Sequence, residues 1–185
     1  MKEHVEDNFM SLNELKNDLA KKQKKGLPFI CASIVIWLLI LAVTALKLPV
    51  LRQNMLVFCC ACPLMPLAWV MGKLMRVDIF DKSNELWKAG FLFTLNQFLY
   101  LLIVMWVLSA VPDKMVMVYA MVFGAHLLPY SWLYKSVSYR VFAIVIPVLA
   151  LALGCLYSAV VVALAMVAVE LLFAALLRAE AKKLQ

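Results

Sequence analysis

The 185-residue sequence has few of the residues that most soluble enzymes depend on. Only 16% of its residues are charged, and it has five glycines and two histidines. It contains no glycine-rich phosphate loop, no nucleophile elbow and no metalloprotease motif. These absences exclude the enzyme classes that such motifs mark, and no residue is predicted to be catalytic.

The cysteines give no metal-binding pattern. The stretch CCAC at 59–62 places Cys59 and Cys62 on one helix face. A structural zinc takes four ligands and usually lies in a loop, and His126 is the only other nearby candidate. We therefore expect no metal and no cofactor, and interpret these cysteines as small packing residues.

Apolar residues make up 66% of the chain, and mean hydropathy is +0.92. They fall in blocks of about 17 to 22 residues, the length that a helix needs to cross a hydrocarbon layer of ~30 Å. The sequence therefore predicts an all-α membrane protein, a bundle of six transmembrane helices in the lipid bilayer. The predicted spans, within a transmembrane domain at 27–177, are 27–46, 55–74, 89–110, 115–133, 141–156 and 158–177.

Two stretches of this assignment have alternatives. The last two spans form one apolar run without charge between Arg140 and Glu170, so one strongly tilted helix is the alternative to two spans with a turn at 154–158. The lysines at 21–25 followed by an apolar run also resemble a signal peptide. That run is long for a signal sequence, so we expect an uncleaved first span.

Lysine and arginine predict the orientation, because they are enriched in cytoplasmic loops. Lys47, Arg52 and Lys114 fall on one side of the predicted membrane, and the other fifteen of the 18 basic residues fall on the opposite side. Both termini are therefore predicted to be cytoplasmic, in the cell inner (cytoplasmic) membrane, with a segment at 1–26 and a basic tail at 178–185. The net charge of +7 then reflects topology and binding to lipid headgroups, not a nucleic-acid partner.

A short amphipathic helix is expected before the first span. Ser11 and Glu14 have the spacing of a capping box, and Leu12, Leu15 and Leu19 follow at helical spacing. Such a helix can lie on the membrane surface. A solvated lead-in to the first span is the alternative.

Two spans share a short pattern. When the chain is shifted by 63 residues, PLMPLAW at 63–69 aligns with HLLPYSW at 126–132. This suggests a parallel repeat that pairs the second span with the fourth, an arrangement common in carriers. Chance is the alternative, because proline is frequent in spans and tryptophan favours the interface.

Four polar residues are predicted at one depth of the bundle. Asn96, Gln97, His126 and Glu170 each lie seven or eight residues from the cytoplasmic end of a span, so about 10–12 Å deep at ~1.5 Å per residue. Together they suggest a site for protons or a small polar solute, with Glu170 as the simplest partner of His126. Each is also explained by packing, since intramembrane amides often only join helices.

Prolines are the candidates for helix kinks. A proline leaves the carbonyl four residues earlier without its helical partner, and such a carbonyl can bind a solute or water. Static kinks that only improve packing are the alternative. The kink candidates are Pro63, Pro66, Pro129 and Pro147.

These features favour a small, proton-linked carrier that works as a homodimer. The alternative is a non-catalytic module for membrane assembly, sensing or lipid binding. An intramembrane enzyme acting on a lipid or quinone ranks third, because the sequence offers no nucleophile or metal set beside its acid–base pair. In length, topology and charge layout the chain resembles small six-span bacterial integral membrane proteins of unknown function. That resemblance implies no activity and no site residue.

Overall fold

A computed structural model describes residues 10–184, and over this range the chain is helical and has no strand. The predicted all-α fold is thus confirmed. In chain order the elements are α1 (Leu12–Lys22), η1 (Lys24–Gly26), α2 (Leu27–Ala45), α3 (Val50–Cys59), α4 (Leu64–Met75), α5 (Trp87–Ala110), η2 (Pro112–Lys114), α6 (Met115–His126), α7 (Leu128–Leu133), α8 (Val137–Leu156) and α9 (Ala159–Lys182).

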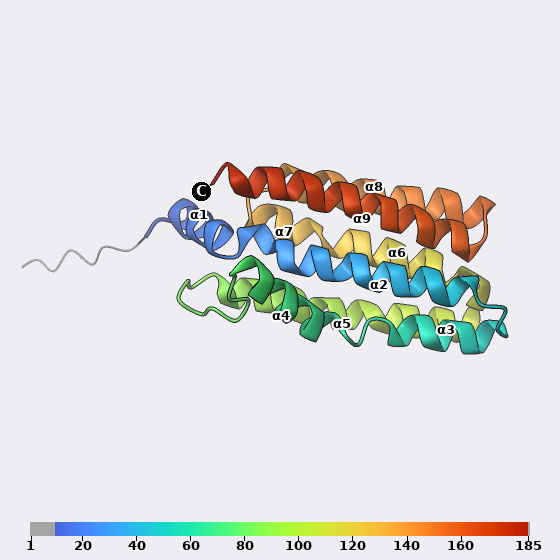
Figure 1. Ribbon diagram of the computed structural model, residues 1–185. Coiled ribbons are helices and arrows are strands. Elements are labelled where there is room, and N and C mark those ends of the chain that lie inside the picture. Colours follow the sequence, from blue (N-terminus) through green and yellow to red (C-terminus); the bar gives the residue numbers. More distant parts are fainter. Residues whose placement is uncertain (1–9, 185) are drawn as a thin grey trace, which may run out of the picture.

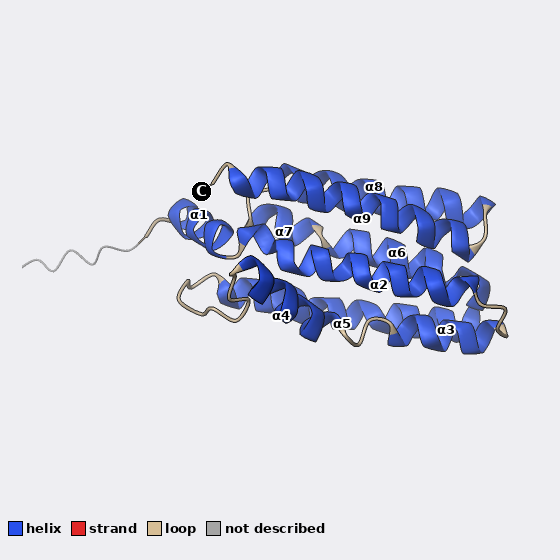
Figure 2. Cartoon of the chain, in the orientation of Figure 1, coloured by secondary structure: helices blue, strands red, loops and turns tan. Residues whose placement is uncertain are grey.

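The long helices run side by side in an elongated bundle (Figures 1 and 2). In the view of Figure 1, α8 and α9 lie above, α2 and the pair α6–α7 lie in the middle, and α5 and the pair α3–α4 lie below. The most extensive helix contacts are those of α6 with α8, α2 with α9, and α2 with α4. We call the end that carries α1 and the last turn of α9 the basic end, and the opposite end the far end.

The helices are long and apolar enough to cross a membrane, as the sequence predicts. Five segments satisfy this criterion by themselves, and α3 with α4 makes a sixth if the bent pair is one span. The five are Lys24–Ala45, Trp87–Ala110, Pro112–Leu133, Val137–Leu156 and Ala159–Lys182. The protein is therefore a multi-pass membrane protein.

The expected continuous span at 55–74 is a bent pair of helices. α3 starts earlier than expected, at Val50, and α4 follows at an angle of 41° after a break of a few residues. The apolar run from Arg140 to Glu170 is divided between two helices, since α8 ends at Leu156 and α9 begins at Ala159. Hydropathy cannot distinguish a straight helix from a broken one, because both are equally apolar.

Helix α1 has the predicted capping box but is packed against the bundle. The Ser11 amide donates to the Glu14 carboxylate at 2.7 Å, and these contacts lower the pKa of Glu14 below its ordinary value. The Lys16 ammonium lies 3.3 Å from the centre of the Trp132 ring, and Leu19 is buried. The side chain of Asn84 donates to the Leu15 carbonyl at 2.8 Å. The helix is thus held at the basic end of the bundle by specific contacts.

The tightest helix contact, between α6 and α8, depends on two glycines. A Cβ atom on Gly124 would lie 2.5 Å from Cδ of Pro147 and 2.7 Å from a methyl carbon of Ile146. A Cβ atom on Gly154 would collide with the side chain of Met117. Small residues allow such close approach in membranes, where packing is a main source of helix association.

We expect Gly124→Ala and Gly154→Ala to destabilise the protein by similar amounts. At Gly124 the new methyl would lie 2.5 Å from Cδ of Pro147, and at Gly154 it would lie 2.5 Å from Cβ of Met117. Neither a proline ring nor a Cβ atom can move aside by side-chain rotation, so overpacking costs about 1–3 kcal/mol in both variants. Unfolding of both variants in one detergent tests this, and wild-type stability of either variant would contradict it.

Candidate functional site

Glu170 lies at the interface between α2 and α9, and its side chain is fully buried. One of its carboxyl oxygens is hydrogen-bonded to the hydroxyl of Ser33. The other oxygen is buried and has no hydrogen-bond partner among the described residues. Ser33 was not among the predicted site residues, although it is the seventh residue of the first predicted span and so lies at the predicted depth.

The bonds of Ser33 show which protonation state fits this arrangement. The Ser33 hydroxyl lies 2.8 Å from the carbonyl oxygen of Ile30, to which it donates. A hydroxyl has one hydrogen, so Ser33 can donate to the Ile30 carbonyl or to Glu170, not to both. Both contacts are hydrogen bonds only when Ser33 donates to Ile30 and a protonated Glu170 donates to Ser33. The geometry therefore fits a neutral carboxylic acid, which also avoids the cost of a buried charge, on the order of 3 kcal/mol or more.

Asn96 and Gln97 lie on α5, the least buried of the long helices. Both side chains are partly exposed, and neither amide forms a hydrogen bond within residues 10–184. Gln97 shares a helix face with Phe93 and Thr94, which contact Tyr130 of α7. The Thr94 and Tyr130 hydroxyls are 3.0 Å apart, and the Phe93 and Tyr130 ring centres are 5.7 Å apart. Gln97 is therefore on the side of α5 that faces α6 and α7.

His126 is the last residue of α6, at the break before α7. Its ring packs edge-on against Phe123 at 5.2 Å and Tyr130 at 6.1 Å between ring centres. Its Nδ1 atom is buried and forms no well-aligned hydrogen bond in the described part of the chain, and the imidazole lies near the backbone of Val122 and Phe123 in its own helix. α5 and the pair α6–α7 are antiparallel, and they are in contact at Thr94 and Tyr130. Gln97 lies about one turn after Thr94, and His126 lies about one turn before Tyr130, so Gln97 and His126 are at the same height in the bundle.

The predicted layer thus divides into two groups. Glu170 is bonded to Ser33 between α2 and α9, whereas His126 and Gln97 lie at the contact of α5 with α6–α7. Asn96 lies next to Gln97 on α5 and shares a helix face with the exposed Leu92 and Leu99. Trp37 of α2 packs against Phe123, which is a ring neighbour of His126, with 6.0 Å between the two ring centres. The structure therefore gives Glu170 a partner other than the predicted one.

The prolines play different parts. Pro63 ends the break between α3 and α4, and Pro66 lies in the first turn of α4. Pro129 lies in the first turn of α7, directly after the break at Leu127. Pro147 lies within α8, which continues without a break. The break between α3 and α4 covers residues 60–63, which the 63-residue shift aligns with 123–126. In that second stretch α6 continues to His126, and the interruption falls at Leu127, whose backbone is still helical.

A second polar cluster, at the basic end, was not predicted. Glu180 of α9 accepts hydrogen bonds from the Ser136 hydroxyl at 2.7 Å, the Ser138 hydroxyl at 2.6 Å and the Ser138 amide at 2.8 Å. The Lys25 ammonium lies 2.9 Å from the same carboxylate and is almost fully buried. Each of these side chains is partnered, so the cluster is best explained as a structural connection.

The far end has a polar hollow of about 400 Å³, lined in part by Gln53, Asn54 and Lys114. Lys114 donates to the Gly154 carbonyl at 2.7 Å, and Asn54 donates to the Pro112 carbonyl at 2.7 Å. Gln53 donates to carbonyls at the end of α2. Lys114 and Gln53 thus satisfy carbonyl groups at the ends of α8 and α2, and Asn54 joins α3 to the start of η2.

Over residues 10–184, no three histidine, cysteine or carboxylate side chains lie close enough to hold a metal ion. Comparison with curated proteins and with solved structures gives no match. The model of one family, described as a family of unknown function (DUF7010), matches residues 12–180. The chain therefore belongs to the DUF7010 family.

Proposed function

We propose that this protein is a small carrier that binds a polar solute between α5 and the pair α6–α7. The observation that supports this most strongly is the buried Nδ1 atom of His126, which forms no well-aligned hydrogen bond among the described residues, beside the face of α5 that carries Gln97. Polar groups inside a membrane are costly when unpaired, so they are retained where they bind something.

The three side chains indicate the chemistry of the solute. The amides of Asn96 and Gln97 each donate and accept hydrogen bonds, and the imidazole of His126 does both through its two nitrogens. They suit a small molecule that carries donors and acceptors close together. Because Glu170 is engaged by Ser33, His126 is the group that would exchange a proton in a proton-linked cycle.

The broken helices support a carrier. α3–α4 is bent by 41° at its break, and α6–α7 is interrupted at Leu127, one to four residues beyond the aligned positions of the 63-residue pattern. A proline ends the first break and follows the second interruption. Discontinuous helices at matching positions of two repeats typically form the binding sites of transporters. Pro129 also leaves the carbonyl of Ala125, next to His126, without its helical partner.

A screen of defined solutes tests this function. Purified protein is heated with individual amino acids, small amides, polyols and ammonium salts, and each stabilising compound is then tested for flux in proteoliposomes that contain a pH-sensitive dye. At least one compound should stabilise the wild type and enter the vesicles. His126→Phe and Gln97→Leu should each lower that flux by about tenfold or more, since each removes a bond that is made inside the membrane.

Ser109→Ala is the matched control, because Ser109 is a polar residue of the same helix at its exposed far end. It should transport as the wild type does. The carrier proposal fails if no compound in the screen stabilises or enters the vesicles, or if His126→Phe transports at the wild-type rate.

The second candidate is a non-catalytic module that assembles in the membrane. The exposed surface of α5 favours this candidate. Only two α5 residues are buried, Val104 and Val107. Its large exposed side chains include Phe98, Leu102 and Trp106. In this case α5 would pair with α5 of a second copy and the amides would bond across the contact. Cross-linking of Leu102→Cys, in native membranes and before any solute is added, should then trap a dimer.

A further inference from the structure

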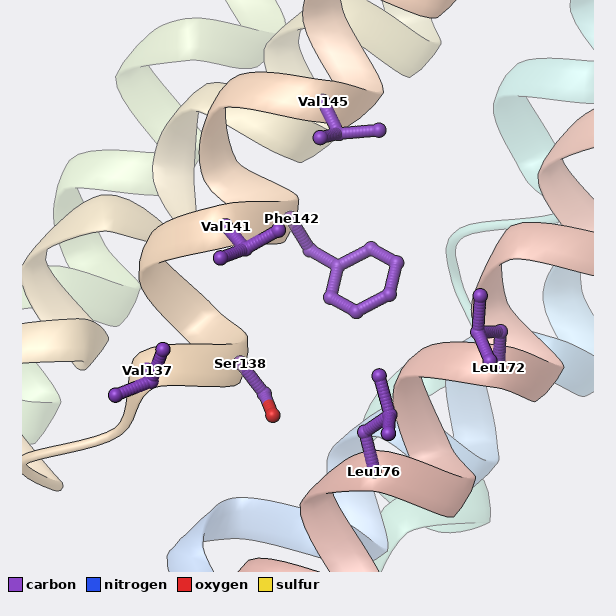
Figure 3. A pocket seen from close by; sticks show the side chains of 7 residues that line it. All are labelled: Val137, Ser138, Val141, Phe142, Val145, Leu172 and Leu176. Atoms are coloured by element: carbon purple, nitrogen blue, oxygen red, sulfur yellow. The ribbon is translucent and has the colours of Figure 1, made fainter.

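Two hollows on the surface of the bundle differ in the polar groups that they offer to a ligand. The groove between α8 and α9 is lined by seven side chains, of which only Ser138 is polar (Figure 3). The Ser138 hydroxyl donates to Glu180 at 2.6 Å, so the polar group of this groove is already bonded within the protein. The hollow at the far end, of about 400 Å³, has the size of a small-molecule site and is lined by both polar and apolar side chains.

The far-end hollow has two walls that are connected by η2. Asn54 of α3 donates to the Pro112 carbonyl at 2.7 Å, which places α3 beside the start of η2. Lys114 donates to the Gly154 carbonyl at 2.7 Å, which places the end of η2 beside the turn between α8 and α9. One wall is therefore formed by α3, and the opposite wall by that turn and the start of α9.

Unused hydrogen-bond acceptors mark the α3 wall. Gln53 and Asn54 line the hollow, and each uses its amide nitrogen to donate to backbone carbonyls, whereas neither amide oxygen has a partner among residues 10–184. Asn54 is 3% exposed, yet its oxygen is accessible and therefore opens into the hollow. Asp113 of η2 also lines the hollow, and its exposed carboxylate forms no ion pair in the same range. Two amide oxygens and a carboxylate suit an ammonium group.

Hydrogen-bond donors mark the opposite wall. An ammonium group has three N–H donors, and the structure shows one bond from Lys114, to the Gly154 carbonyl. The Ser158 hydroxyl lines the hollow and stands directly before α9, yet it makes no capping bond to that helix. Ala159 and Val160 begin α9, where N–H groups lack intrahelical partners and the helix carries partial positive charge. This wall suits a carboxylate.

We propose that the far-end hollow binds a small zwitterion, namely a free amino acid with an apolar side chain. The ammonium group would bind at the α3 wall with Asp113, and the carboxylate would bind to Lys114 and the start of α9. Val50, Val116 and Val160 also line the hollow and would contact the apolar side chain. An amino acid uses both walls at once, and hydrogen bonds to charged groups are the stronger ones. The inference goes beyond the carrier proposal and does not rest on it.

The first experiment varies the ligand. Calorimetry measures binding of L-leucine to the full chain in nanodiscs of phosphatidylcholine, and the wild type should bind leucine saturably. Leucinamide lacks the carboxylate and 4-methylpentanoate lacks the ammonium group. Each should bind at least about tenfold more weakly, the factor expected for the loss of a hydrogen bond to a charged group. Binding of either analogue as tightly as leucine would overturn the inference.

The second experiment varies the walls. Asp113→Asn should weaken leucine binding by about fivefold, the upper end of what an exposed ion pair contributes. Lys114→Met should weaken it by about tenfold, because the lysine is partly buried. Glu85→Gln and Lys47→Met are the matched controls, since both are exposed charged residues that do not line the hollow. Both controls should bind leucine as the wild type does, and thermal unfolding shows which variants are folded.

His126→Phe separates this inference from the carrier proposal, because it should bind leucine at the far end as the wild type does. If His126→Phe abolishes leucine binding, leucine binds at the carrier site and the inference is overturned, whereas the carrier proposal stands. It is also overturned if the wild type shows no saturable binding, or if Asp113→Asn binds leucine with the wild-type affinity.

A lipid headgroup is the other source of the same pair of charges. Phosphatidylethanolamine carries an ammonium group beside a phosphate, whereas the quaternary amine of phosphatidylcholine has no N–H donor. Leucine binding in nanodiscs that contain phosphatidylethanolamine should equal that in phosphatidylcholine alone. If phosphatidylethanolamine abolishes it, the hollow holds a lipid headgroup and the assignment to a free amino acid is overturned.

Discussion

Glu180→Ala is expected to lower the free energy of unfolding by about 3 kcal/mol, the lower end of the range for breaking a buried ion pair. The Lys25 ammonium is 7% exposed and the Glu180 carboxylate is 22% exposed, so the lysine would be left buried without its counter-ion. The lower end of the range applies because water still reaches the carboxylate. Chemical unfolding in a single detergent measures the effect.

The expected loss is large because this carboxylate joins three parts of the bundle. Lys25 precedes α2 and lies in a turn in which Lys24, Lys25 and Gly26 all have positive φ angles, of 46°, 55° and 72°. Ser136 and Ser138 are at the first turn of α8, and Glu180 itself is near the end of α9. Removing Glu180 therefore releases the unusual turn and the start of α8 together.

Glu85→Ala is the matched control, since Glu85 is an exposed carboxylate at the same end of the bundle. It should change stability by less than about 0.5 kcal/mol, as surface substitutions usually do. The double variant Lys25→Met with Glu180→Met should recover part of the loss, because apolar replacements leave no buried charge unpaired. A loss below about 1 kcal/mol for Glu180→Ala would show that the pair contributes no more than an exposed salt bridge.

The sequence predicts this cluster poorly because helix ends are hard to place within a basic segment. Residues 178–185 were expected to be a basic cytoplasmic tail, yet α9 continues to Lys182. Glu180 is therefore held on a helix that brings it to Ser136 and Ser138, 42 to 44 residues away in the sequence. Spacing along the chain contains no sign of that contact.

The depth of the polar residues could be predicted, but their partners could not. Counting along a helix gives height, because each residue rises by a fixed ~1.5 Å. Which neighbour a residue faces also depends on the order of the helices around the bundle, and hydropathy carries little information about that order. This is why Glu170 and His126 were expected together, whereas α9 packs on α2 and presents Glu170 to Ser33.

Glu170→Gln is expected to have nearly the wild-type free energy of unfolding. Glu170→Ala should lower the free energy of unfolding by about 2–5 kcal/mol, the range for large-to-small changes in a packed interior. The glutamine amide nitrogen donates to the Ser33 hydroxyl as a carboxylic acid does, and it fills the same volume. Alanine leaves a cavity at a fully buried position. Chemical unfolding in one detergent compares the two variants.

Infrared spectroscopy checks the protonation state directly. The wild type should show the carbonyl band of a protonated carboxylic acid. This band should be lost in Glu170→Gln. It should shift in Ser33→Ala, because Ser33 is the hydrogen-bond partner of Glu170. If Glu170→Gln destabilises as strongly as Glu170→Ala, the carboxyl group is charged and its charge is needed for folding.

The same variant separates the structural and functional roles of Glu170. If Glu170→Gln is stable and carries solute with its protons at the wild-type rate, Glu170 joins α2 to α9, and any proton linkage depends on His126. If it is stable but carries solute without protons, Glu170 gives up its proton during the cycle. The contact with Ser33 would then have to open, because in the arrangement described here the carboxyl group is sealed from water. The stability of one variant, measured beside its flux, therefore decides which of the two buried groups moves a proton.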